Sequence, residues 1–145
     1  MLTMAVFSQQ EKTVQWLTFE QLSDSLHKHP KKICIDFYAD WCAPCLKMQQ
    51  EVFTDEKVIK ELNANYYAVK MNVESTDTIL FGNQRFINKR AKRRNPVHEI
   101  PLLMASQKDR PFSLPTLIFL DENFQATARY FQYLNVEQFL KIISE

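Results

Sequence analysis

The segment that most constrains this chain is an apolar run followed almost at once by two closely spaced cysteines. Residues 33–39 are nearly all apolar, and such a run predicts a central strand that is buried on both faces of a sheet. The run leads into Trp41-Cys42-Ala43-Pro44-Cys45, at the junction with an expected helix. Two cysteines separated by two residues form a dithiol that can cycle with a disulfide. The chain is therefore expected to carry a reactive pair of thiols at the point where a buried strand ends and a helix begins.

Helical and strand patterns alternate along most of the chain. The apolar patterns predict strands at residues 14–17, 33–39, 66–73, 116–120 and 126–131. Helices are expected after the capping box Thr18/Gln21, after the cysteine pair to about residue 52, after Thr54-Asp55, and after Asn135 with Gln138. This alternation predicts an α/β fold whose sheet contains parallel pairs, with the last two strands as an antiparallel pair at one side.

The middle of the chain does not follow this alternation. Residues 78–81 and 84–87 are expected to form a small hairpin around Gly82-Asn83, which contains the only glycine of the chain. Asn95-Pro96 is a candidate helix start. Pro101 indicates that this helix either kinks at that residue or begins later.

Composition limits the function classes open to the chain. Its 145 residues suffice for one domain with its own core, expected at residues 13–145. Eighteen Lys and Arg nearly balance seventeen Asp and Glu, so the net charge does not indicate binding to nucleic acid or to a membrane surface. No stretch has the roughly 18–20 apolar residues of a membrane span. Residues 1–12 are interpreted as either a flexible start or the remnant of a signal segment.

Positive charge is concentrated in one part of the chain. Five cations lie between Lys89 and Arg94, and residues 82–112 hold eight Lys and Arg against two acidic residues, a local charge of +6. Because the whole chain carries +1, the remainder carries −5. A solvated loop is the first interpretation, and docking to an acidic partner is the second. Nucleic acid is not expected as a partner, because no aromatic residues alternate with the cations.

The two cysteines of the pair are expected to differ in role. Cys42, as the more exposed cysteine and the cap of the next helix, is the candidate nucleophile, because helix N-terminal N–H groups stabilise a thiolate and lower its pKa below about 8.5. Cys45, one turn into the helix, is the candidate resolving thiol. The alternative is half of a metal site, but zinc takes about four ligands and the chain has no second such pair, so no metal is expected. His27 and His29 fit a surface position at a helix end.

A carboxyl group stands inside the apolar strand. Burial raises the pKa of Asp36, which suits a group that takes up the proton when Cys45 becomes a thiolate. The other interpretation is a structural carboxylate paired with Lys70, and the two are compatible. Cys34 shares the strand face of Asp36 by the alternation of a strand. It is interpreted as a small buried apolar residue, with a redox role as the alternative.

The chain resembles the thioredoxin superfamily over about residues 14–144. The resemblance rests on the cysteine pair together with Asp36 six residues before Cys42, Lys70 in a later strand, and Leu114-Pro115-Thr116 before the strand that follows. It implies a thioredoxin fold, in which a central mixed sheet has helices on both faces. Within the superfamily, the chain is most similar to extracytoplasmic thioredoxin-like proteins such as the C-terminal domain of DsbD. Residues 77–95 are then an insertion before the third helix.

The resemblance also implies which residues carry the activity. Relatives hold the proline that corresponds to Pro115 in the cis form, where it leaves a backbone edge for an extended substrate. The implied catalytic residues are Cys42, Cys45, Asp36 and Lys70, and the implied substrate-binding residues are Trp41, Ala43, Pro44, Leu114, Pro115 and Thr116. Trp41 has packing against the protein as an equal alternative.

The activity implied by the resemblance is that of a thiol–disulfide oxidoreductase that reduces protein disulfides. The redox-active disulfide Cys42–Cys45 serves in place of any other cofactor, and the expected partners are protein disulfides and an upstream thiol reductant. We expect a monomer in a bacterial periplasm or cell envelope, with the cytoplasm as the alternative. A partner-binding module and a disulfide oxidant or isomerase are the other interpretations.

The chain departs from the family pattern at three places. Ala43-Pro44 stands where relatives have Gly-Pro, so their reduction potential does not transfer to this chain. Leu114 is not the commonest residue at a position that touches the substrate in relatives. Gln132-Tyr133 stands where relatives often have a glycine that lets a partner approach closely.

Overall fold

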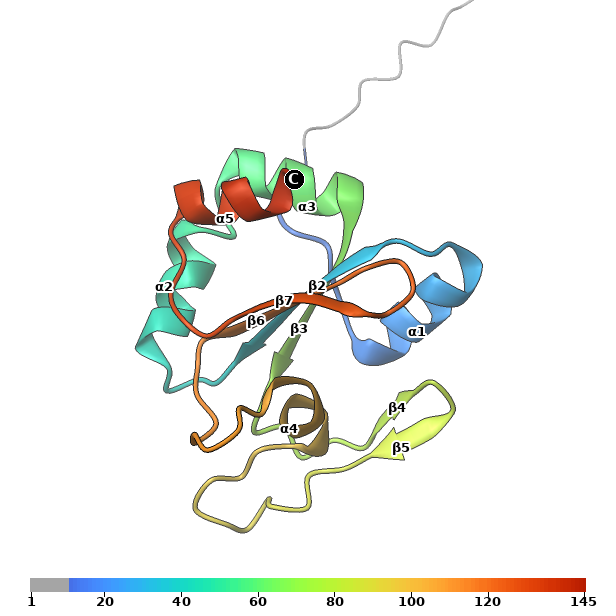
Figure 1. Cartoon of the computed structure of the whole chain (residues 1–145), viewed down its shortest axis with the longest axis vertical. Coiled ribbons are helices and arrows are strands. Elements are labelled where there is room, and N and C mark those ends of the chain that lie inside the picture. The colour runs from blue at the N-terminus through green and yellow to red at the C-terminus, as the bar shows by residue number, and fades with distance from the viewer. Residues whose placement is uncertain (1–10) are drawn as a thin grey trace, which may run out of the picture.

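The computed structural model describes residues 11–145, so most of the expected flexible start or signal remnant at residues 1–12 lies outside the described part. Helices and strands alternate as Figure 1 shows. In chain order the elements are β1 (Trp16–Leu17), α1 (Phe19–Lys28), β2 (Lys32–Tyr38), α2 (Ala43–Glu51), α3 (Glu56–Asn65), β3 (Tyr66–Asn72), β4 (Ile79–Phe81), β5 (Gln84–Phe86), α4 (Glu99–Ala105), β6 (Thr116–Leu120), β7 (Ala126–Tyr130) and α5 (Val136–Ile143).

Five strands form one mixed sheet in the order β1-β3-β2-β6-β7. The pairs β1/β3 and β2/β3 are parallel, whereas β2/β6 and β6/β7 are antiparallel. Strand β2 lies at the centre, and residues 33–37 are all buried, which explains their nearly continuous apolarity. The expected α/β fold, with parallel pairs and an antiparallel pair at one side, is confirmed.

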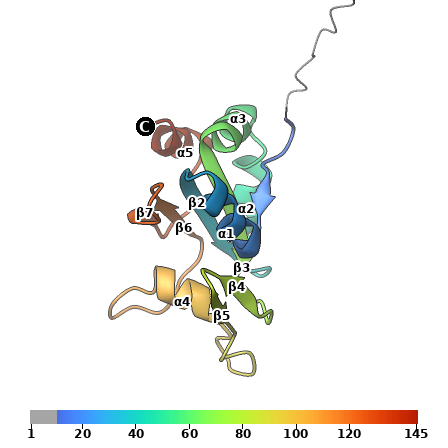
Figure 2. The ribbon, with the colours of Figure 1, turned by 90° about the vertical axis from the view of Figure 1, so that its right-hand side faces the viewer.

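Helices cover both faces of the sheet, so the core consists of two layers. Apolar side chains of α1 and α4 pack on one face, and those of α3, α5 and the later part of α2 pack on the other. Cys45, in the first turn of α2, belongs to the same cluster as α1 and α4. Figures 1 and 2 show the insertion and α4 at one end of the molecule, away from α3 and α5. Within residues 11–145, no helix is long and apolar enough to cross a membrane.

The helix starts follow the capping residues read from the sequence. Thr18 with Gln21, and Asn135 with Gln138, form complete capping boxes at α1 and α5. The Asp55 carboxylate accepts hydrogen bonds from two N–H groups of α3. This cap separates α3 from α2, so the insertion precedes the fourth helix of the chain, α4.

The hairpin β4–β5 is confirmed, and it is fixed to the domain through α1. Gly82 and Asn83 both have positive φ, 59° and 64°, as a two-residue turn between twisted strands requires. The Phe81 ring packs edge-on against Phe19, with ring centroids 5.6 Å apart. The backbone N–H of Leu80 donates to the Glu20 carboxylate at 3.1 Å. The first half of the insertion is therefore a packed element rather than a free loop.

Helix α4 begins later than Asn95-Pro96, at Glu99, as Pro101 indicated. Pro101 is tolerated in the first turn because an N–H there has no partner within the helix. The cap is His98, a fully buried residue whose Nδ1 accepts from the N–H of Ile100 at 3.2 Å. That acceptor role assigns the ring proton to Nε2, which then donates to the Asp77 carbonyl at 2.9 Å. One imidazole thus joins α4 to the start of the hairpin.

Replacing His98 with Ala should loosen this joint. The variant loses a helix cap and leaves a small cavity and an unpaired Asp77 carbonyl, so we expect the free energy of unfolding to fall by about 2 kcal/mol. Chemical denaturation measures the loss, and amide hydrogen exchange should accelerate most within residues 99–105. His27→Ala, at an exposed site on α1, is the matched control and should change stability by less than about 0.5 kcal/mol. Equal effects of the two substitutions would contradict the role of His98.

Candidate functional site

The cysteine pair forms a disulfide at the N-terminus of α2. Cys42 is the N-cap residue, and its Sγ accepts a hydrogen bond from the Cys45 N–H at 3.2 Å. The two Cα atoms are 5.3 Å apart. The Cys42 N–H donates in turn to the Ala39 carbonyl at 3.1 Å, which ties the helix start to the end of β2. The expected cap and junction of strand and helix are confirmed, and a Cys42 thiolate would lie at the positive end of the helix.

The expected difference in exposure between the two cysteines is wrong. Cys42 is 3% exposed and Cys45 is 2% exposed, and both belong to the hydrophobic cluster that also contains Ala39. Both sulfurs are therefore enclosed in this oxidised state. Position on the helix, rather than exposure, distinguishes the two sulfurs.

Asp36 is buried in β2 on the sheet face that α2 covers. Burial raises the pKa of its carboxyl group to about 7, an effect that the nearby positive charge of Lys70 partly offsets. Asp36 and Lys70 are neighbours in register on β2 and β3. The Asp36 carboxylate and the Lys70 ammonium do not form a salt bridge. Among residues 11–145, the only salt bridge within 4.0 Å joins Lys89 and Glu99. The Lys70 ammonium instead lies 5.6 Å from the Trp16 ring centroid and 5.8 Å from that of Tyr38.

Cys34 lies on the same face as Asp36 and has no exposed surface. Burial, and next to it the charge of Asp36, raises the pKa of its thiol well above the ordinary value. A neutral, enclosed thiol is a poor nucleophile. These properties agree with the interpretation of Cys34 as a small apolar core residue.

The loop before β6 carries the expected cis proline. The Leu114-Pro115 peptide bond is cis, and Pro115 is buried, whereas Leu114 is half-buried. Thr116 is fully buried, and its hydroxyl donates to the Ser113 carbonyl at 2.7 Å. The Thr116 side chain thereby holds the bend that presents Leu114.

Trp41 stands at the surface beside the disulfide rather than in the core. It is 69% exposed, and its indole N–H donates to the Glu74 carboxylate at 3.1 Å. Ala43 and Pro44 are exposed as well, with Pro44 in the first turn of α2. The three residues form an accessible rim around the disulfide.

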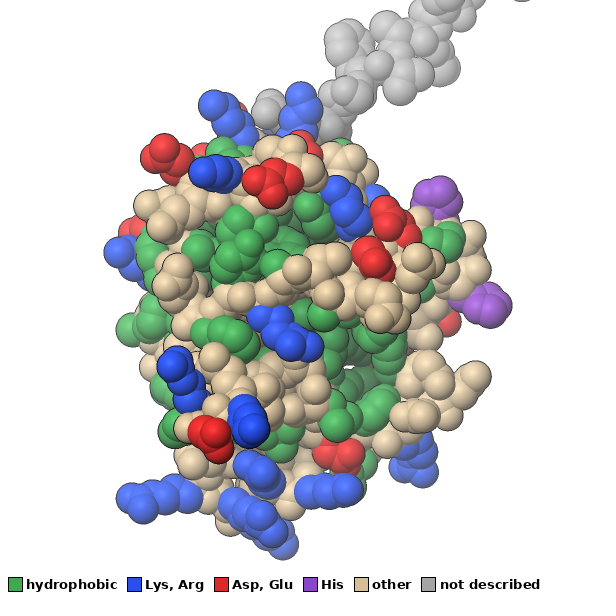
Figure 3. All heavy atoms as spheres, viewed as in Figure 1, with side chains coloured by type: hydrophobic (Ala, Val, Ile, Leu, Met, Phe, Trp, Pro, Cys, Tyr) green, Lys and Arg blue, Asp and Glu red, His purple; other side chains and the backbone are tan. Residues whose placement is uncertain are grey.

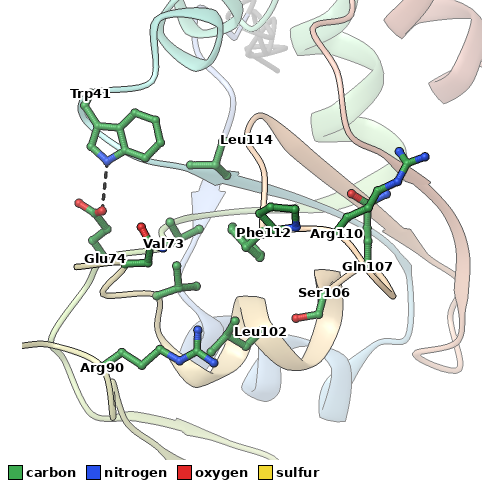
Figure 4. A pocket seen from close by; sticks show the side chains of 13 residues that line it. Trp41, Val73, Glu74, Arg90, Leu102, Ser106, Gln107, Arg110, Phe112 and Leu114 are labelled. Carbon is green, nitrogen blue, oxygen red and sulfur yellow. Dashed lines mark hydrogen bonds between the residues drawn. The ribbon is translucent and has the colours of Figure 1, made fainter. Parts of the chain in front are cut away.

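Sequence reasoning missed Glu74, which fixes the Trp41 ring (Figure 4). Glu74 follows β3, and the carboxyl ends of the parallel strands β2 and β3 meet at one edge of the sheet. That rule would have placed a residue after β3 beside the segment after β2. Sequence reasoning also missed a cavity next to Trp41 and Leu114, to which the insertion contributes Arg90.

The described residues offer no arrangement of metal ligands. Within residues 11–145, no three His, Cys, Asp or Glu side chains gather closely enough to hold an ion. His27 and His29 are exposed on and just after α1. The nitrogens of His98 are both engaged in hydrogen bonds.

The strand order, the disulfide at the start of α2 and the cis proline directly before β6 define a thioredoxin fold with a C-x-x-C disulfide. The chain belongs to the thioredoxin-like domain family, whose sequence profile matches residues 19–145. The superfamily expected from the sequence is confirmed.

Relatives and solved structures agree with this family. The thiol:disulfide interchange protein DsbD of Yersinia enterocolitica is 26% identical over 141 residues, which cover 91% of this chain and 20% of the relative. The structure of a DsbH oxidoreductase aligns with a TM-score of 0.63 and 16% identity, covering 97% of this chain and 90% of that one. The reduced C-terminal domain of DsbD from Neisseria meningitidis aligns with a TM-score of 0.54 and 15% identity, covering 85% and 88%.

The chain corresponds to one part of the longer proteins that it matches. It spans between 10% and 20% of the length of the curated DsbD relatives. What is shared is therefore the thioredoxin-like domain and its C-x-x-C disulfide, a combination that supports thiol–disulfide oxidoreductase chemistry.

Proposed function

We propose that this protein reduces disulfides of partner proteins through its Cys42–Cys45 pair. The observation that carries the proposal is the position of Cys42 as N-cap of α2, with its sulfur accepting the Cys45 N–H. The same N–H groups stabilise a thiolate in the reduced state, and the thiolate is the attacking species in disulfide exchange.

The reaction is two successive exchanges. The Cys42 thiolate attacks one sulfur of the partner disulfide, so that a mixed disulfide forms and the other partner sulfur leaves as a thiolate. Cys45 then loses its proton and attacks Cys42, which forms the Cys42–Cys45 disulfide and releases the second partner thiol. Two electrons pass to the partner, and an upstream thiol reductant restores the dithiol.

The proposed role of Asp36 is to take up the proton that Cys45 loses. Its raised pKa of about 7 suits exchange of a proton near neutral pH. By the alternation of β2 it shares the sheet face of Cys34, which packs in one cluster with Met48 of α2. Lys70 acts through its charge, which keeps that pKa from rising further.

The rim around the disulfide is the proposed binding site for the partner chain. Trp41, Ala43 and Pro44 are accessible next to the disulfide, and Leu114 packs against the cluster that contains Cys42 and Cys45. An extended substrate would pair with the backbone of that loop, as peptides pair with exposed strand edges. Thr116 contributes by holding the loop in place.

The DsbD relatives favour a place in a bacterial cell envelope over the cytoplasm. A bacterial periplasm is kept oxidising, so a reductant there depends on a dedicated electron donor. The thiol reductant that recharges Cys42 and Cys45 is therefore proposed to be a protein of the same compartment.

The reduction potential tests the proposed direction. In equilibration of the purified chain with glutathione or dithiothreitol buffers, a value toward the roughly −270 mV of thioredoxin would support a reductant, whereas a value near −120 mV would identify an oxidant. The Cys34→Ala variant is the control and should give the same potential, because Cys34 is enclosed in the core.

A further inference from the structure

A cavity of about 450 Å³ opens directly beside the proposed exchange site. Trp41, next to Cys42, and Leu114, next to Pro115, form its near wall. Arg90 from the insertion and Arg110 from the segment after α4 also line the cavity, and Figure 4 shows them at different sides of it. A partner chain bound at the disulfide would therefore extend over a cavity that the insertion helps to build.

The lining of this cavity combines apolar and polar side chains, and it includes the two arginines Arg90 and Arg110. Apolar side chains that line it include Val73, Leu102 and Phe112. Among residues 11–145, neither Arg90 nor Arg110 has an ion-pair partner within 4.0 Å or a hydrogen bond from its guanidinium group. The one carboxylate in the lining, Glu74, is already bonded to the Trp41 indole.

The surroundings of the cavity reinforce its positive charge. Figure 3 shows Lys and Arg side chains gathered at the end of the molecule where the insertion lies. Residues 82–112 carry a net charge of +6, and the rest of the chain carries −5. Such asymmetry steers an acidic partner toward one end of the molecule.

We propose that this cavity binds acidic side chains of the partner protein that flank the cysteine attacked by Cys42. Each carboxylate would accept hydrogen bonds from Arg90 or Arg110, in the forked geometry that guanidinium groups favour. Carbon atoms of the bound segment would cover Leu102 and Phe112. Arg90 of the insertion and Arg110 together would give the protein a preference for cysteines in acidic segments, and this inference rests on the proposed function.

Two synthetic peptides test the preference. Each has one cysteine, joined as a mixed disulfide to thionitrobenzoate, and Glu in one or Gln in the other at the second and third positions on both sides. The reduced chain attacks the peptide sulfur through Cys42, the S–S bond breaks, and thionitrobenzoate leaves as a coloured thiolate. Cys45 then releases the peptide thiol. We expect a second-order rate constant about tenfold larger for the Glu peptide, the effect of one added charged hydrogen bond.

Two double variants locate the effect. Arg90→Gln/Arg110→Gln should bring the Glu/Gln rate ratio close to one, whereas Arg93→Gln/Arg94→Gln removes the same charge from exposed residues outside the cavity and should leave most of the ratio. A charge reversal, Arg90→Glu/Arg110→Glu, should favour a matching Lys peptide. Equal rates of the two peptides with the native chain would overturn the proposal, as would an equal loss of the ratio in both Gln variants.

The same measurements distinguish failure of the proposed function from failure of the acidic-segment proposal. The Gln peptide reports the exchange reaction itself, because it lacks the acidic side chains. If the chain attacks that peptide no faster than free cysteine does, the proposed function fails. If it attacks that peptide rapidly but without preference for Glu, only the acidic-segment proposal fails.

Discussion

Replacing Cys45 with Ala should trap partner proteins on Cys42 as mixed disulfides. Without the resolving thiol the first exchange still proceeds, but the second has no intramolecular nucleophile, and disulfide turnover should fall by a factor on the order of 10³ or more. Non-reducing electrophoresis of cells that express the variant measures the trapped species. These species should disappear when dithiothreitol is added.

Matched variants show whether the trap depends on the proposed chemistry. Cys42→Ser removes the attacking sulfur and should trap nothing, and Cys34→Ala should trap nothing because Cys45 still resolves the intermediate. If Cys45→Ala forms no mixed disulfide while Cys42→Ser still binds partners, the protein is a binding module and its dithiol is incidental.

The parts of the fold that were predicted depend on local chemistry. The turn at Gly82-Asn83 needs positive φ at two residues, and the capping boxes at Thr18 and Asn135 satisfy N–H groups within one turn of chain. Similarly, the proximity of Cys42 and Cys45 follows from their spacing. Each of these features is determined by a few neighbouring residues, so a single sequence suffices to identify it.

The parts that were not predicted depend on packing between distant segments. The start of α4 is fixed by His98, whose ring nitrogen also reaches the Asp77 carbonyl, 21 residues earlier. The burial of Cys42 depends on a cluster that joins it to distant segments, such as Ile118 of β6. The cavity requires Trp41, the insertion and the segment after α4 to come together. The order of side chains along the sequence does not by itself indicate which distant segments pack together.

Asp36→Asn should stabilise the oxidised protein at alkaline pH. The ordinary carboxyl pKa is 3.8, and burial raises that of Asp36 to about 7 in the fold. Between these values the folded state binds the proton more tightly than the unfolded state does. The resulting stability is fully present below about pH 4 and is lost as the pH rises through about 7. Asn is neutral at every pH, so the stability of the Asp36→Asn variant relative to the native chain should increase with pH.

The size of this effect and its cost to function are both measurable. The pKa difference corresponds to at most about 4 kcal/mol well above pH 7, so urea denaturation at pH 5 and pH 9 should show the two proteins diverging by a few kcal/mol. Asp40→Asn, at an exposed carboxyl nearby, should follow the native chain at both values. The Asp36 variant should also resolve mixed disulfides more slowly, by about 10²-fold, the range of a single general base. A stability difference that does not change with pH would show that Asp36 is ionised in the core, and its proposed exchange of a proton with Cys45 would then fail.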